Sequence, residues 1–258
     1  ELGLTKIIPT FFLYPLLSIM TLKLLIYKYV LYKNYYKIYI MNIALFDLDN
    51  TLIKGDSDYQ WGNYLVENNY VDPIYYKEKN DNFFKQYRNG TLCAREFAQF
   101  SYEPFTKYNY ETLVDIRSRF FEEKIKPLVL PKAEELVKFH KNENHTLAIV
   151  TATNSFISRV SADYFEINDL LASEPEFKNG QFTGRLDGEP CYQEGKVTKV
   201  KEWLSVNKYS NYDDIFFYTD SHNDLQLMEF CSKPIAVDPD DKLKEISIQK
   251  NWEIISLR

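Results

Sequence analysis

Short apolar runs separated by amphipathic stretches set the pattern of this chain. The runs that predict strands buried on both faces of a sheet are 42–47, 146–151, 214–219 and 234–237. Shorter strands are expected at 170–173 and near 252–256, and helices are expected at 155–164, 197–204 and 225–231. This alternation predicts an α/β fold built on a doubly wound parallel sheet. One hairpin is expected at 176–184, because Asn179-Gly180 favours a tight turn between strands.

A long helical insertion separates the first two predicted strands. Residues 57–60 have the form of a capping box, and apolar residues repeat behind it at helix spacing: Trp61, Tyr64 and Leu65. Further amphipathic segments predict helices at 81–88, 91–102 and 110–124. We therefore predict a core of residues 41–54 and 132–258 and a helical domain of residues 55–131.

Residues 1–40 differ in composition from the rest of the chain. They hold seven of the 21 tyrosines and five lysines but one acid, Glu1. The charge-free stretch 7–22 is shorter than the ~20 residues that cross a bilayer, and its two prolines weaken a helix. The open interpretations are a membrane anchor, a signal-like leader, or translation from upstream of a true start at Met41. We favour the start at Met41, which predicts a cytoplasmic protein.

Composition and charge suit an ordinary enzyme. The chain is 45% hydrophobic and 26% charged, and its net charge of −6 predicts no nucleic-acid surface. The three cysteines lack the spacing of metal ligands, which fits a reducing compartment. The sequence leaves the oligomeric state open.

Two carboxylates, Asp47 and Asp49, follow the first predicted strand, and Thr51 comes next. Buried strands do not normally end in paired acids, because like charges removed from water need a cation or a shared proton. Open α/β sheets bind ligands at the carboxyl ends of their strands. The pattern therefore predicts a metal site at the end of strand 42–47.

Three further polar signals follow in order along the chain. Strand 146–151 ends at Thr151, Lys196 opens a helix after Glu194-Gly195, and strand 214–219 leads into Asp220 and Asp224. Together with the first pair, this set resembles the haloacid dehalogenase (HAD) superfamily of phosphohydrolases from about residue 42 to the C-terminus. One such motif recurs by chance, but four in the right order are specific. The resemblance implies a Rossmann-like core, with the helical insertion as a cap over the active site.

The resemblance also implies a role for each motif residue. Asp47 would be the nucleophile that forms an aspartyl-phosphate, and Asp49 the general acid and base. Mg²⁺ would be held by Asp47, the Asp49 backbone carbonyl and Asp220. Phosphoryl oxygens would be bound by Thr151, the Ala152 amide and Lys196, and metal-bound water would be oriented by Asn223 and Asp224.

Structural alternatives exist for several of these residues. Asp47 and Asp49 would serve equally well as turn caps if they stood alone, and Lys196 as a surface lysine. Thr153 competes with Thr151 for the phosphate-binding position. We interpret His222 as solvent-facing and leave it out of the site, although histidine titrates near neutrality.

Residues around the motifs resemble more narrowly the phosphoserine phosphatase-like branch, which includes histidinol-phosphatases. The matching segments are 55–62, 183–185, 193–196 and 220–225. Asn50 replaces the usual serine, and no Glu stands at the position that grips the substrate amine. Asp56 and Asp58 are candidates for that role or for capping a helix, and Arg88 and Arg95 are candidates for binding a substrate carboxylate. The branch implies a small phosphomonoester such as histidinol phosphate or phosphoserine.

Other function classes remain open or are excluded. A phosphotransferase would use the same aspartyl-phosphate, and the sequence does not separate it from a hydrolase. A membrane-anchored phosphatase of lipid phosphates requires residues 1–40 to be a genuine anchor. A catalytically inactive scaffold is not expected, because both Asp47 and Asp49 are present.

Overall fold

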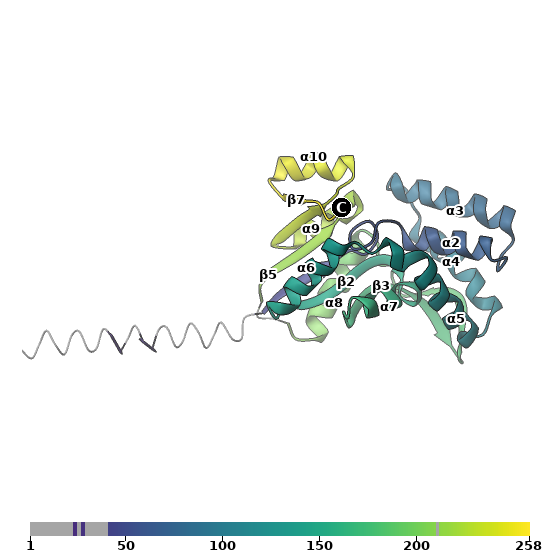
Figure 1. Ribbon diagram of the computed structural model, residues 1–258, viewed down its shortest axis with the longest axis horizontal. Helices are drawn as coiled ribbons and strands as arrows, with labels where there is room; N and C mark the ends of the chain where they lie inside the picture. Colours follow the sequence, from purple (N-terminus) through teal and green to yellow (C-terminus); the bar gives the residue numbers. More distant parts are fainter. Residues whose placement is uncertain (1–22, 25–26, 29–40, 210–211) are drawn as a thin grey trace, which may run out of the picture. The chain divides into compact units, whose positions relative to one another are not determined.

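The computed structural model describes residues 23–24, 27–28, 41–209 and 212–258, and most of the segment 1–40 lies outside them (Figure 1). The chain divides into two compact units, Glu1–Met41 and Asn42–Arg258. In the first unit, residues 23–24 and 27–28 are helical and exposed. None of the helices in the described part of the chain has the length and apolarity to cross a membrane. The expectations about residues 1–40 otherwise fall outside the described residues.

The second unit is built on a seven-stranded sheet with the order β4-β3-β2-β1-β5-β6-β7 among the described residues. The strands are β1 (Met41–Phe46), β2 (Thr146–Asn154), β3 (Asp169–Lys178), β4 (Gln181–Asp187), β5 (Tyr212–Thr219), β6 (Lys233–Val237) and β7 (Glu253–Ile255). β1 pairs with β2, β2 with β3, β5 with β6 and β6 with β7 in parallel. β4 pairs with β3 antiparallel through the turn at Asn179 and Gly180, both at positive φ. The predicted parallel sheet and its hairpin are confirmed.

Helices cover both faces of this sheet, as the doubly wound prediction required. Along β1, Ala44 and Phe46 belong to one hydrophobic cluster, and Ile43 and Leu45 belong to another. The flanking helices are α6 (Pro131–Asn142), α7 (Ser155–Tyr164), α8 (Glu194–Val206), α9 (Leu225–Phe230) and α10 (Asp241–Lys250). Helices α6 and α10 are absent from the sequence prediction. α10 buries only Leu243 and Ser247, so its apolar stripe is too narrow to recognise.

Residues 55–131 form α2 (Ser57–Glu67), α3 (Pro73–Arg88), α4 (Ala94–Tyr102) and α5 (Tyr110–Phe120) with short helical turns after α4 and α5. Figure 1 shows α2, α3 and α4 gathered at one end of the sheet. Two predicted boundaries are wrong. Asp56, not Ser57, caps α2 by accepting a hydrogen bond from the Tyr59 amide, which confirms the capping role considered for Asp56. Helix α3 begins at Pro73 because Asp72 caps it.

An aromatic cluster holds the helical insertion together. The Trp61 ring lies 5.1 Å from that of Phe120 and 6.2 Å from that of Phe105, in edge-on contacts. Phe105 in turn contacts Phe156 of α7 at 5.2 Å, so this hydrophobic layer continues into the sheet side of the molecule. The division into core and cap stays a prediction.

Candidate active site

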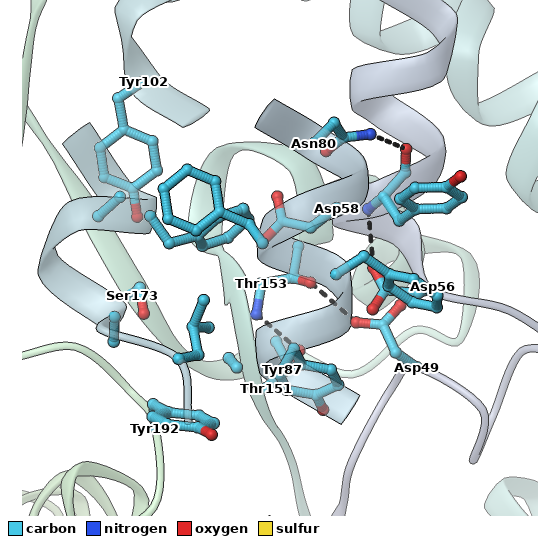
Figure 2. A pocket seen from close by; sticks show the side chains of 18 of the residues that line it. Asp49, Asp56, Asp58, Asn80, Tyr87, Tyr102, Thr151, Thr153, Ser173 and Tyr192 are labelled. Atoms are coloured by element: carbon cyan, nitrogen blue, oxygen red, sulfur yellow. Dashed lines mark hydrogen bonds between the residues drawn. The ribbon is translucent and has the colours of Figure 1, made fainter. Parts of the chain in front are cut away.

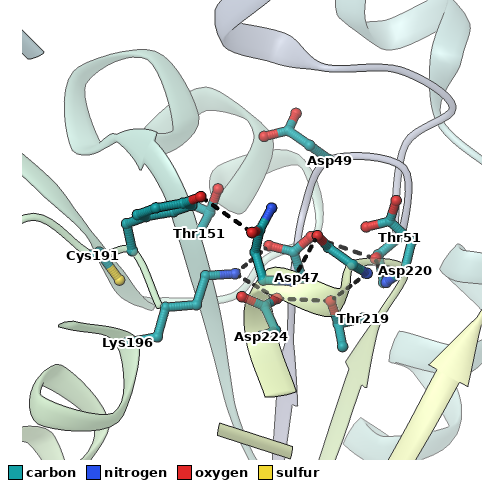
Figure 3. Close-up of polar contacts among 12 residues, drawn as sticks. Asp47, Asp49, Thr51, Thr151, Cys191, Lys196, Thr219, Asp220 and Asp224 are labelled. Carbon is teal, nitrogen blue, oxygen red and sulfur yellow. Dashed lines mark hydrogen bonds and ion pairs between the residues drawn. The ribbon is translucent and has the colours of Figure 1, made fainter. Parts of the chain in front are cut away.

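The polar residues predicted from the motifs meet where β1, β2 and β5 end (Figure 3). Asp47 directly follows β1, and its amide donates to the Tyr218 carbonyl of β5 at 2.9 Å. Thr151 belongs to β2, the parallel neighbour of β1 on the other side. Asp220 follows β5 directly. Parallel neighbours bring their carboxyl ends to one edge of the sheet, which is why residues far apart in the sequence share this site.

Lys196 is the cation of the site. Its side chain is 2% exposed, and Nζ lies 2.9 Å from Asp47 Oδ1 and 2.7 Å from Asp224 Oδ2. The Thr219 hydroxyl also donates to Asp224 Oδ2, at 2.7 Å. Burial works against the charged lysine, but the charges of Asp224 and Asp47 outweigh it and raise the pKa of Lys196. Lys196 is therefore a buried lysine paired with two carboxylates, not a surface lysine.

Gly195 allows Lys196 to enter the site. A Cβ at this position would lie 1.9 Å from the Pro190 carbonyl oxygen, closer than any side chain tolerates. The chain turns sharply there, with Gln193 at a φ of +49° just before α8 begins. The glycine in the sequence motif is thus required by a close backbone approach.

Thr51 links Asp47 to the loop after β5. Its hydroxyl oxygen accepts from the Asp220 amide at 3.1 Å and donates to Asp47 Oδ2 at 3.5 Å. Burial raises the pKa of Asp47 to about 7, and the charges of Asp224 and Asp49 add to that rise while Lys196 opposes it. Burial also raises the pKa of Asp220, to which the charge of Asp47 contributes.

Asp49 lies beside Asp47 but has different hydrogen-bond partners. The Ser57 amide donates to Asp49 Oδ1 at 2.6 Å, and the Thr153 hydroxyl donates to Oδ2 at 2.8 Å. Burial and then the charge of Asp56 raise the pKa of Asp49 to about 7. Thr153 thus contacts Asp49, whereas the Thr151 hydroxyl oxygen accepts from the Thr153 amide at 3.2 Å. Both threonines that competed in the sequence belong to the site.

A divalent cation fits the acidic side of this arrangement. The Asp220 carboxylate has no hydrogen-bond donor and no ion pair among the described residues, and the Asp47 carboxylate is nearly buried. Two carboxylates with Lys196 as their nearest cation favour a further positive charge. Within the described part of the chain, no group of three or more His, Cys, Asp or Glu side chains is placed to hold a metal. Mg²⁺ needs fewer protein ligands than that, because it keeps several waters.

Asn223 connects this edge of the sheet with the helical insertion. Its Nδ2 donates to the Tyr87 carbonyl at the end of α3 at 3.2 Å, and its Oδ1 accepts from the Tyr192 hydroxyl at 3.1 Å. The interpretation of His222 as solvent-facing is wrong. Its side chain is 12% exposed, and its Nδ1 lies 2.8 Å from an oxygen of Asp240, which caps α10.

A pocket opens from Asp47, Asp49 and Thr151 toward the helical insertion (Figure 2). Its far side is mostly aromatic, and the rings come from Tyr59, Phe83, Phe84, Tyr87, Phe97 and Tyr102. Both Asp56 and Asp58 line it, with pKa values that burial raises, that of Asp56 to about 6. Ala152 lines it beside Thr151.

The two arginine candidates do not line this pocket. The Arg95 guanidinium lies 2.6 Å from Glu189, in an exposed ion pair. Arg88 borders a neighbouring cleft together with Asp220, His222 and Asp240. The carboxylate-binding role proposed for arginine therefore finds no support in the geometry.

Several residues of the pocket were missed in the sequence. Asn80, Tyr87 and Tyr192 line it, yet none belongs to a motif. Tyr192 directly precedes the Gln193-Glu194-Gly195-Lys196 segment, so the motif spacing gave a weak signal for it. Asn80 and Tyr87 lie on α3, where nothing in the local pattern separates a pocket residue from a core residue.

Comparison with known proteins agrees with this geometry. Residues 44–229 match the haloacid dehalogenase-like hydrolase family. A histidinol-phosphatase of Neisseria meningitidis is 34% identical over 220 residues, which cover 84% of this chain and 99% of that protein. Phosphoserine phosphatase SerB1 of Mycobacterium tuberculosis is 26% identical over 221 residues, which cover 83% of this chain and 70% of that protein.

A solved structure is similar over the same share of the chain. A Bordetella pertussis protein with unknown function has a TM-score of 0.81 and 35% sequence identity, and the match covers 85% of this chain and 100% of that one. The family match thus runs from β1 to α9, and the relative and the solved structure each cover about 85% of this chain. The chain belongs to the haloacid dehalogenase-like hydrolase family, in its branch of phosphoserine phosphatase- and histidinol-phosphatase-like phosphatases.

Proposed function

We propose that this protein hydrolyses a small phosphomonoester through an aspartyl-phosphate formed on Asp47, with Mg²⁺ as cofactor. The observation that carries the proposal is the pairing of Asp47 with Lys196 at one end of the pocket while Asp49, two residues on, is held apart by Ser57 and Thr153. Two neighbouring carboxylates with different partners suit two different tasks in one reaction.

The phosphoryl group would occupy the space between Asp47, Thr151 and Lys196. A phosphate monoester is an anion, so its oxygens need donors and positive charge. Lys196 supplies the fixed charge, and the Thr151 hydroxyl and the Ala152 amide are the proposed donors on the β2 side. Mg²⁺, held by Asp47, the Asp49 carbonyl and Asp220, would neutralise further phosphoryl charge when bound.

Asp47 and Asp49 would then divide the chemistry. An Asp47 oxygen attacks phosphorus, the bond from phosphorus to the alcohol oxygen breaks, and Asp49 donates its proton to that oxygen. In the second step Asp49 takes a proton from water, the water oxygen attacks phosphorus, and the bond to Asp47 breaks. The pKa of Asp49, raised to about 7 by burial and by Asp56, suits a group that must give and take a proton near neutrality.

The relatives indicate which phosphomonoesters to test first. The Neisseria meningitidis histidinol-phosphatase is the more similar of the two named enzymes, and it is matched over 99% of its length. Histidinol phosphate is therefore the first substrate to test, and phosphoserine is the second.

The test is phosphate release by the full chain with Mg²⁺, compared between the wild type, Asp47→Asn and Asp163→Asn. We expect Asp47→Asn to lower kcat on the order of 10⁴-fold, since it removes the nucleophile. Asp163 pairs with Arg159 on an exposed helix face, so its variant should keep full activity. EDTA should abolish turnover and excess Mg²⁺ should restore it. An equally active Asp47→Asn variant, or a wild type that hydrolyses no phosphomonoester, would contradict the proposal.

A further inference from the structure

The main chain of Asp220 is held from both sides. Its amide donates to the Thr51 hydroxyl oxygen at 3.1 Å, and its carbonyl accepts from the Asp240 amide at 2.9 Å. Thr51 belongs to the first sequence motif, whereas Asp240 belongs to none of the four. The position of a proposed Mg²⁺ ligand thus depends in part on a residue that no motif identifies.

A sharp turn after β6 brings Asp240 beside the end of β5. β6 is the parallel neighbour of β5, so both strands end at the same edge of the sheet. Asp238 has a φ of +41°, and its carboxylate accepts from the Leu257 amide at 3.0 Å, which fixes the turn. Asp240 then caps α10, because its Oδ1 accepts from the Leu243 amide at 2.8 Å. The residue that begins α10 therefore lies next to Asp220.

The second carboxylate oxygen of Asp240 holds His222. Asp240 Oδ2 accepts from the His222 amide at 2.8 Å and lies 2.8 Å from His222 Nδ1. A Cβ on Gly90 would lie 3.1 Å from His222 Nε2, so the ring is enclosed between Asp240 and the helical insertion. A helix cap uses one acceptor, and capping alone therefore does not account for the contacts of Oδ2. Asp240 holds the loop 220–224 at two residues, Asp220 and His222.

We infer that Asp240 and His222 are positioning residues that hold the loop 220–224 in the conformation in which Asp220 binds Mg²⁺. This inference rests on the proposed phosphatase function. Residues that orient a metal ligand through hydrogen bonds commonly contribute about 10- to 100-fold to metal affinity. A loop released from Asp240 would adopt several conformations, and the cation would bind only the fraction that presents Asp220 correctly. Asp240 thus acts through the main chain of the loop and does not touch the metal.

Asp240→Ser tests the inference, and Asp241→Ser is its matched control. Serine is a good helix cap, so Asp240→Ser keeps a cap for α10, but its single hydroxyl oxygen cannot also hold His222. Asp241→Ser removes an equal charge one residue along, from an exposed side chain that lines the same cleft beside Asp220. We expect Asp240→Ser to raise the dissociation constant for Mg²⁺ about tenfold, and Asp241→Ser to change it less than about twofold.

Two measurements on the full chain give this dissociation constant. The first is the rise in unfolding temperature when Mg²⁺ is added, taken relative to the same variant without the metal. A general loss of stability drops out of that difference, so a merely structural role of Asp240 would leave it unchanged. The second is the Mg²⁺ dependence of phosphate release from histidinol phosphate. Excess Mg²⁺ should restore most of the turnover that Asp240→Ser loses.

Variants of His222 separate positioning from charge. His222→Ala removes the contact of the ring with Asp240 Oδ2 and leaves the Asp240 carboxylate and the cap of α10 in place. We expect it to raise the dissociation constant for Mg²⁺ about threefold. His222→Asn should restore binding close to that of the wild type, because its amide nitrogen can donate from near the position of Nδ1. These two variants test the inference even if Asp240→Ser does not fold.

The outcomes separate this inference from the proposed function. If Mg²⁺ changes neither the unfolding temperature nor the turnover of the wild type, the proposed function fails in its metal requirement. If Asp240→Ser binds Mg²⁺ as well as the wild type does, the proposed function stands and the positioning role is refuted. Equal weakening in Asp240→Ser and Asp241→Ser would assign the effect to charge and overturn the inference. So would a His222→Asn variant that binds Mg²⁺ no better than His222→Ala.

Discussion

Two pairs of aspartates in this chain have the same spacing and opposite surroundings. Asp47 and Asp49 follow a buried strand, and Asp56 and Asp58 flank the first residue of α2. Asp47 finds its partner, Lys196, 149 positions away in the sequence. Asp56 finds its partner, the Tyr59 amide, three positions away. Both pairs line the same pocket, yet Asp47 belongs to the ion pairs of the candidate active site and Asp56 is a helix cap, because their partners differ.

The difference lies in how each carboxylate charge is compensated. A helix N-terminus offers free backbone amides, so an aspartate there needs no other part of the protein. A strand end in the middle of a sheet offers no such amides, and the compensation must come from neighbouring strands. Asp49 depends on both sources, since it accepts from the Ser57 amide of α2 and from Thr153 of β2. The first and the last of the four predictions below test this contrast directly.

The largest effect on stability should come from removing Lys196, the cation that pairs with Asp47. Lys196→Met leaves Asp47 and Asp224 buried without their partner, and we expect it to lower the free energy of unfolding by about 3 to 5 kcal/mol. Lys201→Met, on the exposed part of the same helix, should change it by less than about 0.5 kcal/mol. Urea denaturation followed by circular dichroism measures both. If the two variants lose equal free energy of unfolding, the buried carboxylate of Asp47 does not depend on Lys196 for its stability.

A buried base should respond to pH with the opposite sign to the buried acids. His140 is fully buried between His145 and Tyr218, and burial lowers its pKa from 6.5 to about 4, with the charge of His145 adding to the effect. As the pH falls below 6.5, the unfolded chain takes up this proton before the folded protein does. Stability is therefore lost between about pH 6.5 and 4, by up to about 3 kcal/mol.

The variant His140→Gln isolates this contribution. Asp47 and Asp49, whose raised pKa values favour the folded state as the pH falls through about 7, are present in both proteins and drop out of the difference. Between pH 7.5 and pH 5, the free energy of unfolding of the wild type should drop relative to that of the variant, by about 2 kcal/mol. If the free energy of unfolding depends on pH in the same way in both proteins, the loss of stability at low pH does not come from His140.

Substitution of Gly90, which lies between the helical insertion and the loop after β5, should have a smaller effect, and that effect should be on kcat/KM. Gly90 has a φ of +70°, and a Cβ there would lie 3.1 Å from His222 Nε2 and 3.2 Å from Asn223 Oδ1. Gly188 has a φ of +73° but open space around it, so Gly188→Ala imposes the same backbone strain without the contact. We expect Gly90→Ala to lower kcat/KM about fivefold relative to Gly188→Ala, which corresponds to ~1 kcal/mol. If Gly90→Ala and Gly188→Ala have the same kcat/KM, the close approach of Gly90 to His222 and Asn223 does not affect catalysis.

The smallest effect should separate the members of the second pair. Asp56→Ala removes the cap of α2 and should lower the free energy of unfolding by about 1 kcal/mol. Asp58→Ala removes a carboxylate that burial disfavours, but it also removes hydrogen bonds with the side chains of Ser101, Thr153 and Asn154. These effects oppose each other, so the stability of Asp58→Ala should change by less than that of Asp56→Ala. Thermal unfolding of the two variants measures the difference. A larger loss for Asp58→Ala would mean that Asp58 has a structural role.

Much of the fold was predictable, because buried parallel strands are continuous apolar runs. The positions of β1, β2, β5 and β6 follow from this property alone, and the hairpin follows from Asn179-Gly180. Helix α10 was not predictable in the same way, since most of its residues contact solvent. The sequence left the cap of α2 open between Ser57 and Asp56, because both are good capping residues and only backbone geometry distinguishes them.

The sequence by itself determined which chemistry is present. Asp47, Asp49, Lys196 and Asp220 stand at the ends of strands or at the start of a helix, and the strand pattern already placed those ends on one edge of the sheet. Only the tertiary structure decided which partner each carboxylate has and what the far side of the pocket is made of. Asn80 and Tyr87 reach the pocket from α3, Arg95 does not, and no local pattern encodes that difference. The reason is physical: a strand end is fixed by short-range hydrophobic periodicity, whereas the wall of a pocket depends on how separate helices pack against the sheet.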